Sequence, residues 1–159
     1  MIYSITKEIQ FDAGHRVPDH KSKCRNPHGH RYRVCATLAA DNLVGRGSSK
    51  GMVMDFGDVK TILTEKIHDV LDHGFIVYEK DHDLMHTFGY AVDPEPSLVT
   101  DDHGWKIIIF PFVPTAENIA RWCFREFLYG LGESNLHGKV TLKSMTVWET
   151  PTSSATYEE

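Results

Sequence analysis

The alternation of apolar and polar side chains between residues 28 and 38 is the feature that most restricts the fold. Every second residue from position 28 onward belongs to one set, which comprises His28, His30, Tyr32, Val34, Ala36 and Leu38. Successive side chains of a β-strand point to opposite faces of the sheet, so this set shares one face. Residues 2–11 alternate in nearly the same way, with Lys7 as the interruption, and His15 continues the parity of Phe11. The sequence therefore predicts two strands, each with one face to be covered.

Two helices are predicted as that cover. Residues 56–71 place apolar side chains at helical spacing after Asp55, which suits the N-cap position. Gly74 suits a left-handed position just beyond the end of this helix. A second amphipathic helix is predicted after Thr115, another N-cap residue, and it is expected to end at a turn region over residues 130–138.

Further strands complete the predicted order. Residues 75–104 are mixed, and we expect a long excursion there with a short strand at its start. Residues 105–112 are apolar and rich in isoleucine, which indicates a buried strand, and residues 139–150 form a final strand. The tail after Pro151 is polar. The order β-β-α-β-α-β predicts a single α+β domain over residues 1–159.

Composition excludes several classes of function. Lys and Arg number 17 against 22 Asp and Glu, a net charge of −5 without a basic run, so no nucleic-acid partner is expected. No stretch approaches the ~18 apolar residues that a membrane span requires, so no membrane partner is expected. Three cysteines without a CxxC pair exclude a closed disulfide framework. We expect reduced thiols and a cytoplasmic location.

Ten histidines point toward a metal, because histidine is the commonest metal ligand in proteins. His28 and His30 share one face of a strand, and His15 can lie opposite them if the first two strands pair as a hairpin. Three neutral imidazoles leave one position open on a tetrahedral zinc ion, as in catalytic sites. The alternative is that the histidines at the strand edge contact only solvent.

Candidate reactive groups lie close to these histidines in the sequence. Cys24 precedes His28 by four residues, and a thiol beside a metal ion can act as a base or nucleophile. The same spacing also fits a fourth metal ligand or an inert loop thiol. Asp72 and His73 follow the first helix, where the carboxylate can orient the imidazole and raise its basicity.

Two glutamates are candidate ligand contacts. Glu117 lies in the first turn of the second helix, although the helix dipole alone favours a carboxylate there. Glu149 has the parity of Met145 and Val147 and is therefore expected on an apolar face of its strand. A carboxylate there can serve as a buried acceptor for a ligand with several N–H donors. The remaining histidines are predicted to be solvated, with the pair at 82 and 86 as an alternative second metal site. They are His20, His68, His82, His86, His103 and His137.

Six segments, taken together, resemble one known family. They are FDAGHR (11–16), CRNPHGH (24–30), GMVMDFGDVK (51–60), LDH (71–73), PTAEN (114–118) and VWET (147–150). In this order they are similar to the 6-pyruvoyl-tetrahydropterin synthase and 6-carboxytetrahydropterin synthase family. The resemblance covers residues 1–75 and 111–159.

The resemblance implies a tunnelling fold (T-fold), an antiparallel four-stranded sheet with two helices on one face. Family members form rings, commonly a hexamer of two trimers, so a homo-oligomer with active sites between subunits is implied. The family usually passes from His73 to Pro114 through a short loop. Residues 74–113 here form an insertion, centred on about 76–110, in which Phe75–Tyr78 and Lys106–Phe112 are expected to pair as a hairpin. The insertion is expected to cover the pocket or to add subunit contacts.

The resemblance also implies roles for individual residues. The substrate would be 7,8-dihydroneopterin triphosphate, and the cofactor Zn²⁺. His15, His28 and His30 match the zinc ligands, Cys24 the catalytic thiol, Asp72 and His73 a proton-transfer pair, and Glu149 and Glu117 carboxylates at the pterin. Arg16, Lys21, Lys23 and Arg25 are candidates for the triphosphate, with a solvated loop as the alternative. Ala116 stands where the family frequently has a hydroxyl residue.

The spacing Cys-x3-His-Gly-His looks like that of the bacterial 6-carboxytetrahydropterin synthases. The implied enzyme is a lyase that releases acetaldehyde and triphosphate and leaves 6-carboxy-5,6,7,8-tetrahydropterin, in 7-deazaguanine (queuosine-type) biosynthesis. The alternatives are a 6-pyruvoyl-tetrahydropterin synthase, a non-catalytic pterin- or purine-binding member of the fold, and an unrelated zinc hydrolase.

Overall fold

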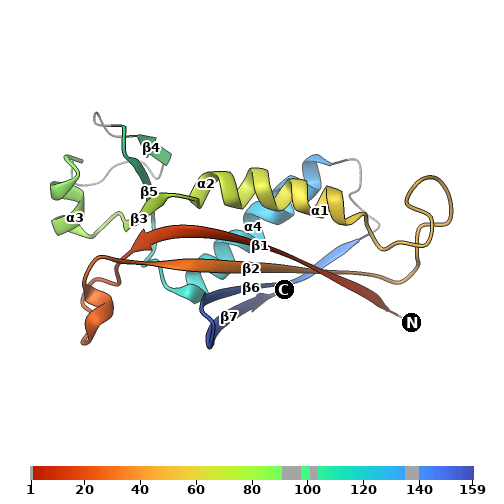
Figure 1. Ribbon diagram of the computed structural model, residues 1–159, viewed down its shortest axis with the longest axis horizontal. Helices are drawn as coiled ribbons and strands as arrows, with labels where there is room; N and C mark the ends of the chain where they lie inside the picture. The colour runs from red at the N-terminus through yellow and green to blue at the C-terminus, as the bar shows by residue number, and fades with distance from the viewer. Residues whose placement is uncertain (1, 91–97, 101–103, 135–139) are drawn as a thin grey trace.

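Seven strands form one sheet in the computed structural model, which describes residues 2–90, 98–100, 104–134 and 140–159. The strands lie side by side in the order β4-β5-β3-β1-β2-β6-β7 (Figure 1). Their bounds are Tyr3–His15 (β1), His28–Ala40 (β2), Gly74–Tyr78 (β3), Leu98–Thr100 (β4), Lys106–Phe110 (β5), Thr141–Thr150 (β6) and Ser153–Glu158 (β7).

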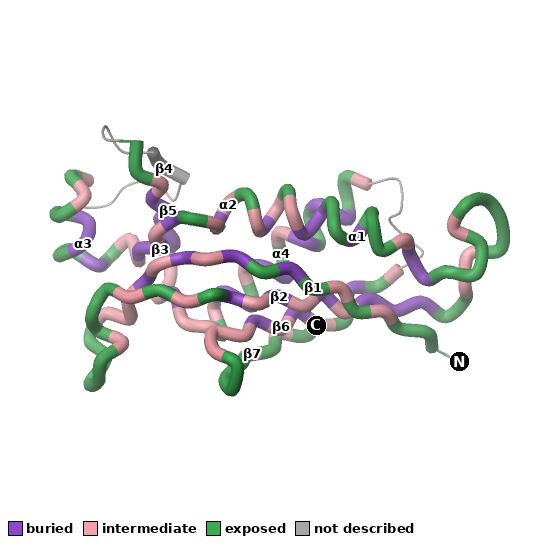
Figure 2. The backbone as a smooth tube through the Cα atoms, viewed as in Figure 1, coloured by how far each residue is buried: buried purple, intermediate pink, exposed green. Residues whose placement is uncertain are grey.

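The two predicted N-terminal strands are confirmed. β1 and β2 pair antiparallel along their full length, which brings His15 directly opposite His28. The predicted faces are also correct, since Phe11 and Tyr32 are 3% and 0% exposed while Arg31 is exposed. Figure 2 shows buried and more exposed positions alternating along both strands. One face of this pair therefore belongs to the core.

The first predicted helix is confirmed as one continuous helical segment. It comprises α1 (Phe56–Leu63), the π-helical turn η2 (Thr64–His68) and α2 (Asp69–Leu71). It begins where the carboxylate of Asp55 accepts a hydrogen bond from the N–H of Gly57, at 2.7 Å. This contact satisfies one of the backbone donors that a helix leaves free at its start.

The second helix, α4 (Ala116–Glu133), starts at the predicted cap, where the hydroxyl of Thr115 accepts a hydrogen bond from Asn118. The prediction that the chain turns at Gly130 is wrong, because α4 continues through this glycine. A Cβ atom on Gly130 would lie 2.8 Å from Cγ2 of Ile62. The glycine therefore permits close packing of α4 on α1 rather than ending the helix. Residues 135–139 of the predicted turn lie outside the described residues.

Both helices cover the same face of the sheet, as expected (Figure 1). Leu63 of α1 and Phe127 of α4 belong to one buried cluster with Tyr32 and Val34 of β2 and Met145 of β6. No helix among the described residues has the length and apolar character needed to cross a membrane.

The expectation of a four-stranded antiparallel sheet is wrong for the sheet as a whole. The neighbouring pairs β1–β2, β2–β6 and β6–β7 are antiparallel, but β3 runs parallel to both β1 and β5, so the sheet is mixed. β7 arises from the polar tail after Pro151, for which no strand was predicted. As an edge strand its side chains are mostly exposed, so the tail carries no apolar run to indicate it.

The predicted hairpin of Phe75–Tyr78 with Lys106–Phe112 is also wrong. β3 and β5 are neighbours, with Phe75 opposite Ile107, but they are parallel. A parallel pair needs a crossover, and part of it is the short helix α3 (His82–Thr87). Both faces of β5 are covered: Ile108 faces the main core, and Ile107 faces a smaller core that includes α3. Burial on both sides explains the continuous apolar run of this strand.

Candidate functional site

Three histidines converge at the end of the β1–β2 pair. His15 ends β1, His28 begins β2, and His30 is two residues further on the same face. One nitrogen from each ring lies within 4.8 Å of the other two, and the ring centroids are 4.6, 4.9 and 5.2 Å apart. The predicted juxtaposition is therefore present, and the three side chains can hold a metal ion.

Hydrogen bonds orient two of these rings. Nδ1 of His15 lies 2.7 Å from the carbonyl oxygen of Pro114, and Nδ1 of His28 lies 2.7 Å from that of Asn26. A carbonyl only accepts, so each Nδ1 carries the proton and each Nε2 offers a lone pair. The Nε2 atoms of His15 and His30 are buried without a hydrogen-bond partner among the described residues. Unpartnered buried nitrogens are costly, so this donor set fits a bound metal ion.

The protonation state of the rings suits the same use. Burial lowers the pKa of His15 to about 4, and the hydrogen bond with Pro114 opposes this shift only in part. Burial also lowers the pKa of His30. Neutral imidazole is the form that binds metals, and no proton needs to be displaced from these two rings at neutral pH.

Glu149 points toward the histidine cluster from β6. Its Oε1 lies 3.4 Å from Nε2 of His15, and its side chain is 25% exposed. Because His15 is neutral, this contact is not an ion pair. Tyr32 lies beside both groups, and burial together with the Glu149 charge raises the pKa of its hydroxyl. The site thus has a carboxylate acceptor next to three metal-ligating nitrogens.

Asp72 and His73 form a turn immediately after α2. Oδ2 of Asp72 lies 2.7 Å from Nδ1 of His73, and its Oδ1 accepts the N–H of Asp12 at 3.0 Å. Burial would raise the pKa of Asp72, but these two hydrogen bonds outweigh it and the pKa lies below the ordinary value. The side chain of His73 is 80% exposed. His73 borders a shallow depression that His30 also lines.

The prediction of a left-handed Gly74 is wrong, because His73 adopts that conformation with φ 57°. A glycine at position 74 has a different consequence. A Cβ atom on it would lie 2.2 Å from Cδ1 of Ile108, so its missing side chain lets β5 approach closely.

The structure does not bring Cys24 or Glu117 into contact with the cluster. Cys24 lies half-buried in the short 3₁₀ helix η1 (Lys23–Arg25), and its carbonyl accepts the N–H of Val17 at 2.8 Å. Its thiol does not belong to the histidine group, so a role as fourth ligand gains no support. Glu117 is exposed in the first turn of α4, without a hydrogen bond or ion pair among the described contacts.

Arg16 is not available to a triphosphate as expected. Its guanidinium forms a two-bond ion pair with Asp81 and reaches Asp83 at 3.2 Å. Asp81 is only 2% exposed and caps α3 by accepting the N–H of Leu84. Asp81 was not predicted from the sequence. The one feature that could have indicated it is its position just before a short helix. The remaining candidate cations, Lys21, Lys23 and Arg25, are exposed.

The other histidines divide into three groups. His20, His82 and His86 are exposed as predicted, and the last two do not belong to a described metal-binding group. The side chain of His68 is 35% exposed, and its Nδ1 lies 2.9 Å from Oδ1 of Asp69, which is also exposed. His103 and His137 lie outside the described residues.

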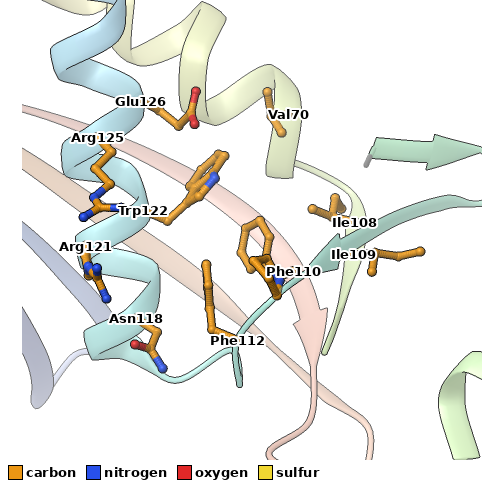
Figure 3. Close-up of a pocket in the computed structure, with 11 residues that line it drawn as sticks. Val70, Ile108, Ile109, Phe110, Phe112, Asn118, Arg121, Trp122, Arg125 and Glu126 are labelled. Carbon is orange, nitrogen blue, oxygen red and sulfur yellow. The ribbon is translucent and has the colours of Figure 1, made fainter. Parts of the chain in front are cut away.

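A separate hollow lies between α4 and β5 (Figure 3), and its lining includes no residue of the histidine cluster. Phe110 and Phe112 line it with Trp122, whose ring centroid lies 5.1 Å from that of Phe110. Arg121 and Arg125 lie along the adjoining face of α4 (Figure 3). No histidine or cysteine lines this hollow. It is therefore not the site predicted from the histidines.

Comparison with known proteins gives relatives along the whole chain. A 6-carboxy-5,6,7,8-tetrahydropterin synthase of Haemophilus influenzae is 32% identical over 158 residues, which cover 99% of this chain and 100% of the relative. The protein of the same name from Aquifex aeolicus is 34% identical over 175 aligned residues, covering 100% and 99%.

Solved structures agree with these relatives. An uncharacterized protein from Wolinella succinogenes has a TM-score of 0.75 at 27% identity and covers 100% of this chain and 99% of its own. The 6-pyruvoyl tetrahydropterin synthase of Caenorhabditis elegans shares the fold, with a TM-score of 0.65 at 23% identity, covering 100% and 96%. The family model described as 6-pyruvoyl tetrahydropterin synthase matches residues 4–159. With that match over nearly all of its length, the chain belongs to the 6-pyruvoyl tetrahydropterin synthase family.

Proposed function

We propose that this protein is a zinc-dependent 6-carboxy-5,6,7,8-tetrahydropterin synthase. It would convert 7,8-dihydroneopterin triphosphate and water into 6-carboxy-5,6,7,8-tetrahydropterin, acetaldehyde and triphosphate. The relatives from H. influenzae and A. aeolicus bear that name and match the chain from end to end. The observation that carries the proposal is the cluster of His15, His28 and His30 beside Glu149. Within the described part of the chain, two buried Nε2 atoms of this cluster have no hydrogen-bond partner.

The three histidines would hold the zinc ion. Nδ1 of His15 and Nδ1 of His28 each donate to a backbone carbonyl, which leaves Nε2 of both rings free to bind a metal ion. The chemistry that zinc supplies is Lewis acidity toward the side-chain hydroxyl oxygens of the pterin, which makes the adjacent C–H and O–H groups more acidic. Three protein ligands leave room for those oxygens.

Cys24, Asp72 and His73 would move the protons. The thiolate of Cys24 would take a proton from the substrate side chain as a general base. His73 would exchange a proton through Nε2, since its Nδ1–H is held by Asp72 at 2.7 Å. The carboxylate stabilises the protonated ring between the two transfers. The side chain of His73 is 80% exposed, so its Nε2 is accessible to a substrate.

Glu149 would anchor the substrate. A pterin carries several N–H donors along its amino-pyrimidine edge, and a carboxylate can accept two of them at once. The 3.4 Å separation from His15 would hold the reacting side chain near the zinc ligands. Glu117 is proposed as a second carboxylate at the pterin.

We also propose that residues 1–159 form one domain that acts within a ring, a hexamer of two trimers. β7 is an edge strand, and β1 pairs with β3 only over residues 13–15, so β1 has no described neighbour along most of its outer side. Long unpaired strand edges tend to pair with another chain. Light scattering after size-exclusion chromatography would measure the predicted mass of six chains.

The decisive experiment is product identification by mass spectrometry after zinc-loaded protein is incubated with 7,8-dihydroneopterin triphosphate. A carboxypterin with acetaldehyde supports the proposal. A 6-pyruvoyl product would replace it with the alternative activity, and no turnover would indicate a binding protein. Cys24→Ala is expected to abolish acetaldehyde release while zinc stays bound, with Cys35→Ala as the matched control. Full activity of Glu149→Gln would contradict the role of Glu149 as the pterin anchor.

A further inference from the structure

We propose that Lys106, in strand β5 of the inserted segment, is a positioning residue for the Asp72–His73 pair. Its Nζ donates to the backbone carbonyl of Asp69 at 2.7 Å and to that of Asp72 at 2.8 Å. The insertion would then support the proton-transfer pair. The catalytic consequence rests on the proposed function, whereas the structural claim can be tested without it.

The first part of the argument is the helix end. α2 ends at Leu71, and the last carbonyls of a helix have no partner within the helix. They also form the negative end of the helix dipole, where a cation is favourable. The ammonium of Lys106 satisfies one of these carbonyls, that of Asp69, and also binds the carbonyl of Asp72, the first residue after the helix. Lys106 thus fixes the backbone from which the Asp72 carboxylate projects.

Strand β1 holds the same turn from the other side. The N–H of Asp12 donates to Oδ1 of Asp72 at 3.0 Å, and the N–H of His73 donates to the carbonyl of Asp12 at 2.7 Å. Between these contacts His73 adopts a φ of 57°, which is unfavourable for a residue other than glycine. A strained conformation persists only where its surroundings hold it. Lys106 and Asp12 together supply that restraint.

The fold explains how a residue of the insertion reaches this turn. Lys106 has the parity of Ile108, which faces the main core, while Ile107 faces the smaller core. Figure 3 shows Ile108 of β5 and Val70 of α2 lining one hollow, so β5 passes beside the end of that helix. A Cβ atom on Gly74 would lie 3.5 Å from Cδ of Lys106 and closer still to Ile108. Glycine at this position lets the strand approach.

The contacts also define the type of role. Lys106 binds only backbone carbonyls in the described contacts and has no contact with the His73 ring or the histidine cluster. It therefore cannot replace His73 as a proton donor. Its loss should alter the placement of the Asp72–His73 pair while leaving zinc and pterin binding intact.

Hydrogen exchange tests the structural claim on the full-length, zinc-loaded protein. Lys106→Met keeps the apolar stem and removes the ammonium. Amide exchange in the peptide spanning residues 68–76 is expected to become about tenfold faster, and Lys106→Arg should restore most of the protection. Lys66→Met is the control. Lys66 lies in η2, which is continuous with α2, and its Nζ loses a 2.6 Å contact with Glu133 of α4. Unchanged exchange in Lys106→Met, or an equal change in the control, would overturn the proposal.

Steady-state kinetics tests the catalytic consequence. Lys106→Met is expected to lower kcat about tenfold with KM and zinc content within twofold of the parent, and Lys106→Arg should recover the rate. Faster exchange with an unchanged kcat would refute a positioning role. If the parent turns over no pterin, the proposed function fails, and the exchange experiment still decides whether Lys106 holds the turn. Lys106→Gln, whose shorter amide cannot span both carbonyls, serves if Lys106→Met does not fold.

Discussion

Arg16→Met should destabilise the protein by breaking the ion pair between Arg16, which follows β1, and Asp81, which precedes α3. The guanidinium of Arg16 binds Asp81 through two hydrogen bonds, and the two side chains are 17% and 2% exposed. Methionine keeps much of the side-chain volume without the charge. Among the described residues, the buried carboxylate of Asp81 would then keep only the N–H of Leu84 as a donor.

The magnitude follows from this burial. Removing one partner of a buried ion pair costs about 3–5 kcal/mol, because the remaining charge is left uncompensated. The hydrogen bond from Leu84 stays in place, so we expect the lower end, about 3 kcal/mol. For a chain of this length that corresponds to a decrease of roughly 6–12 °C in Tm.

The assay is thermal unfolding followed by circular dichroism at one protein concentration, with and without zinc, since ligands and assembly also shift Tm. Asp81→Asn is the partner variant, because its amide oxygen can still cap α3. In Arg16→Met/Asp81→Asn the buried charge is gone, so the double variant should be about as stable as Asp81→Asn alone. A Tm change below 2 °C for Arg16→Met, or strictly additive effects, would refute the reasoning.

Three further outcomes follow from local contacts. Gly130→Ala should lower the free energy of unfolding by about 1–3 kcal/mol in urea titration, because its Cβ would lie 2.8 Å from Cγ2 of Ile62; no change would show that α1 and α4 can separate freely. Asp55→Ala should cost about 1 kcal/mol in the same assay through loss of the helix cap. Iodoacetamide should label Cys35 slowly at pH 8 and about tenfold faster per pH unit, since burial, aided by the Glu8 carboxylate, raises the pKa of that thiol to about 11. Peptide mass spectrometry would follow the label, Glu8→Gln should accelerate it, and rapid labelling at pH 8 would contradict the burial argument.

Patterns confined to one element could be predicted from the sequence. The period-two alternation of residues 28–38 placed His28 and His30 on the same face as Tyr32, because a strand assigns faces by position alone. The N-caps at Asp55 and Thr115 are equally local, since each depends on a side chain within three residues of the N–H that it binds.

The exposed edge strand β7 and the continuation of α4 through Gly130 were harder to predict. The edge strand β7 carries too few buried side chains to produce an apolar pattern, so its sequence resembles a tail. Glycine is typical of turns, yet at position 130 the missing side chain allows α4 to pack closely on α1. In both cases the neighbouring element decides the outcome.

By itself, the sequence determined the two long strands, their buried faces, the helices that cover them and the histidines that share one side. Only the tertiary structure decided the contacts between different elements. These are His15 opposite His28, Arg16 bound to Asp81, and Lys106 bound to the carbonyl of Asp72. A periodic pattern depends only on residues that are close together in the sequence. Contacts between residues 34 or 65 positions apart depend instead on strand register and on the space left between packed elements.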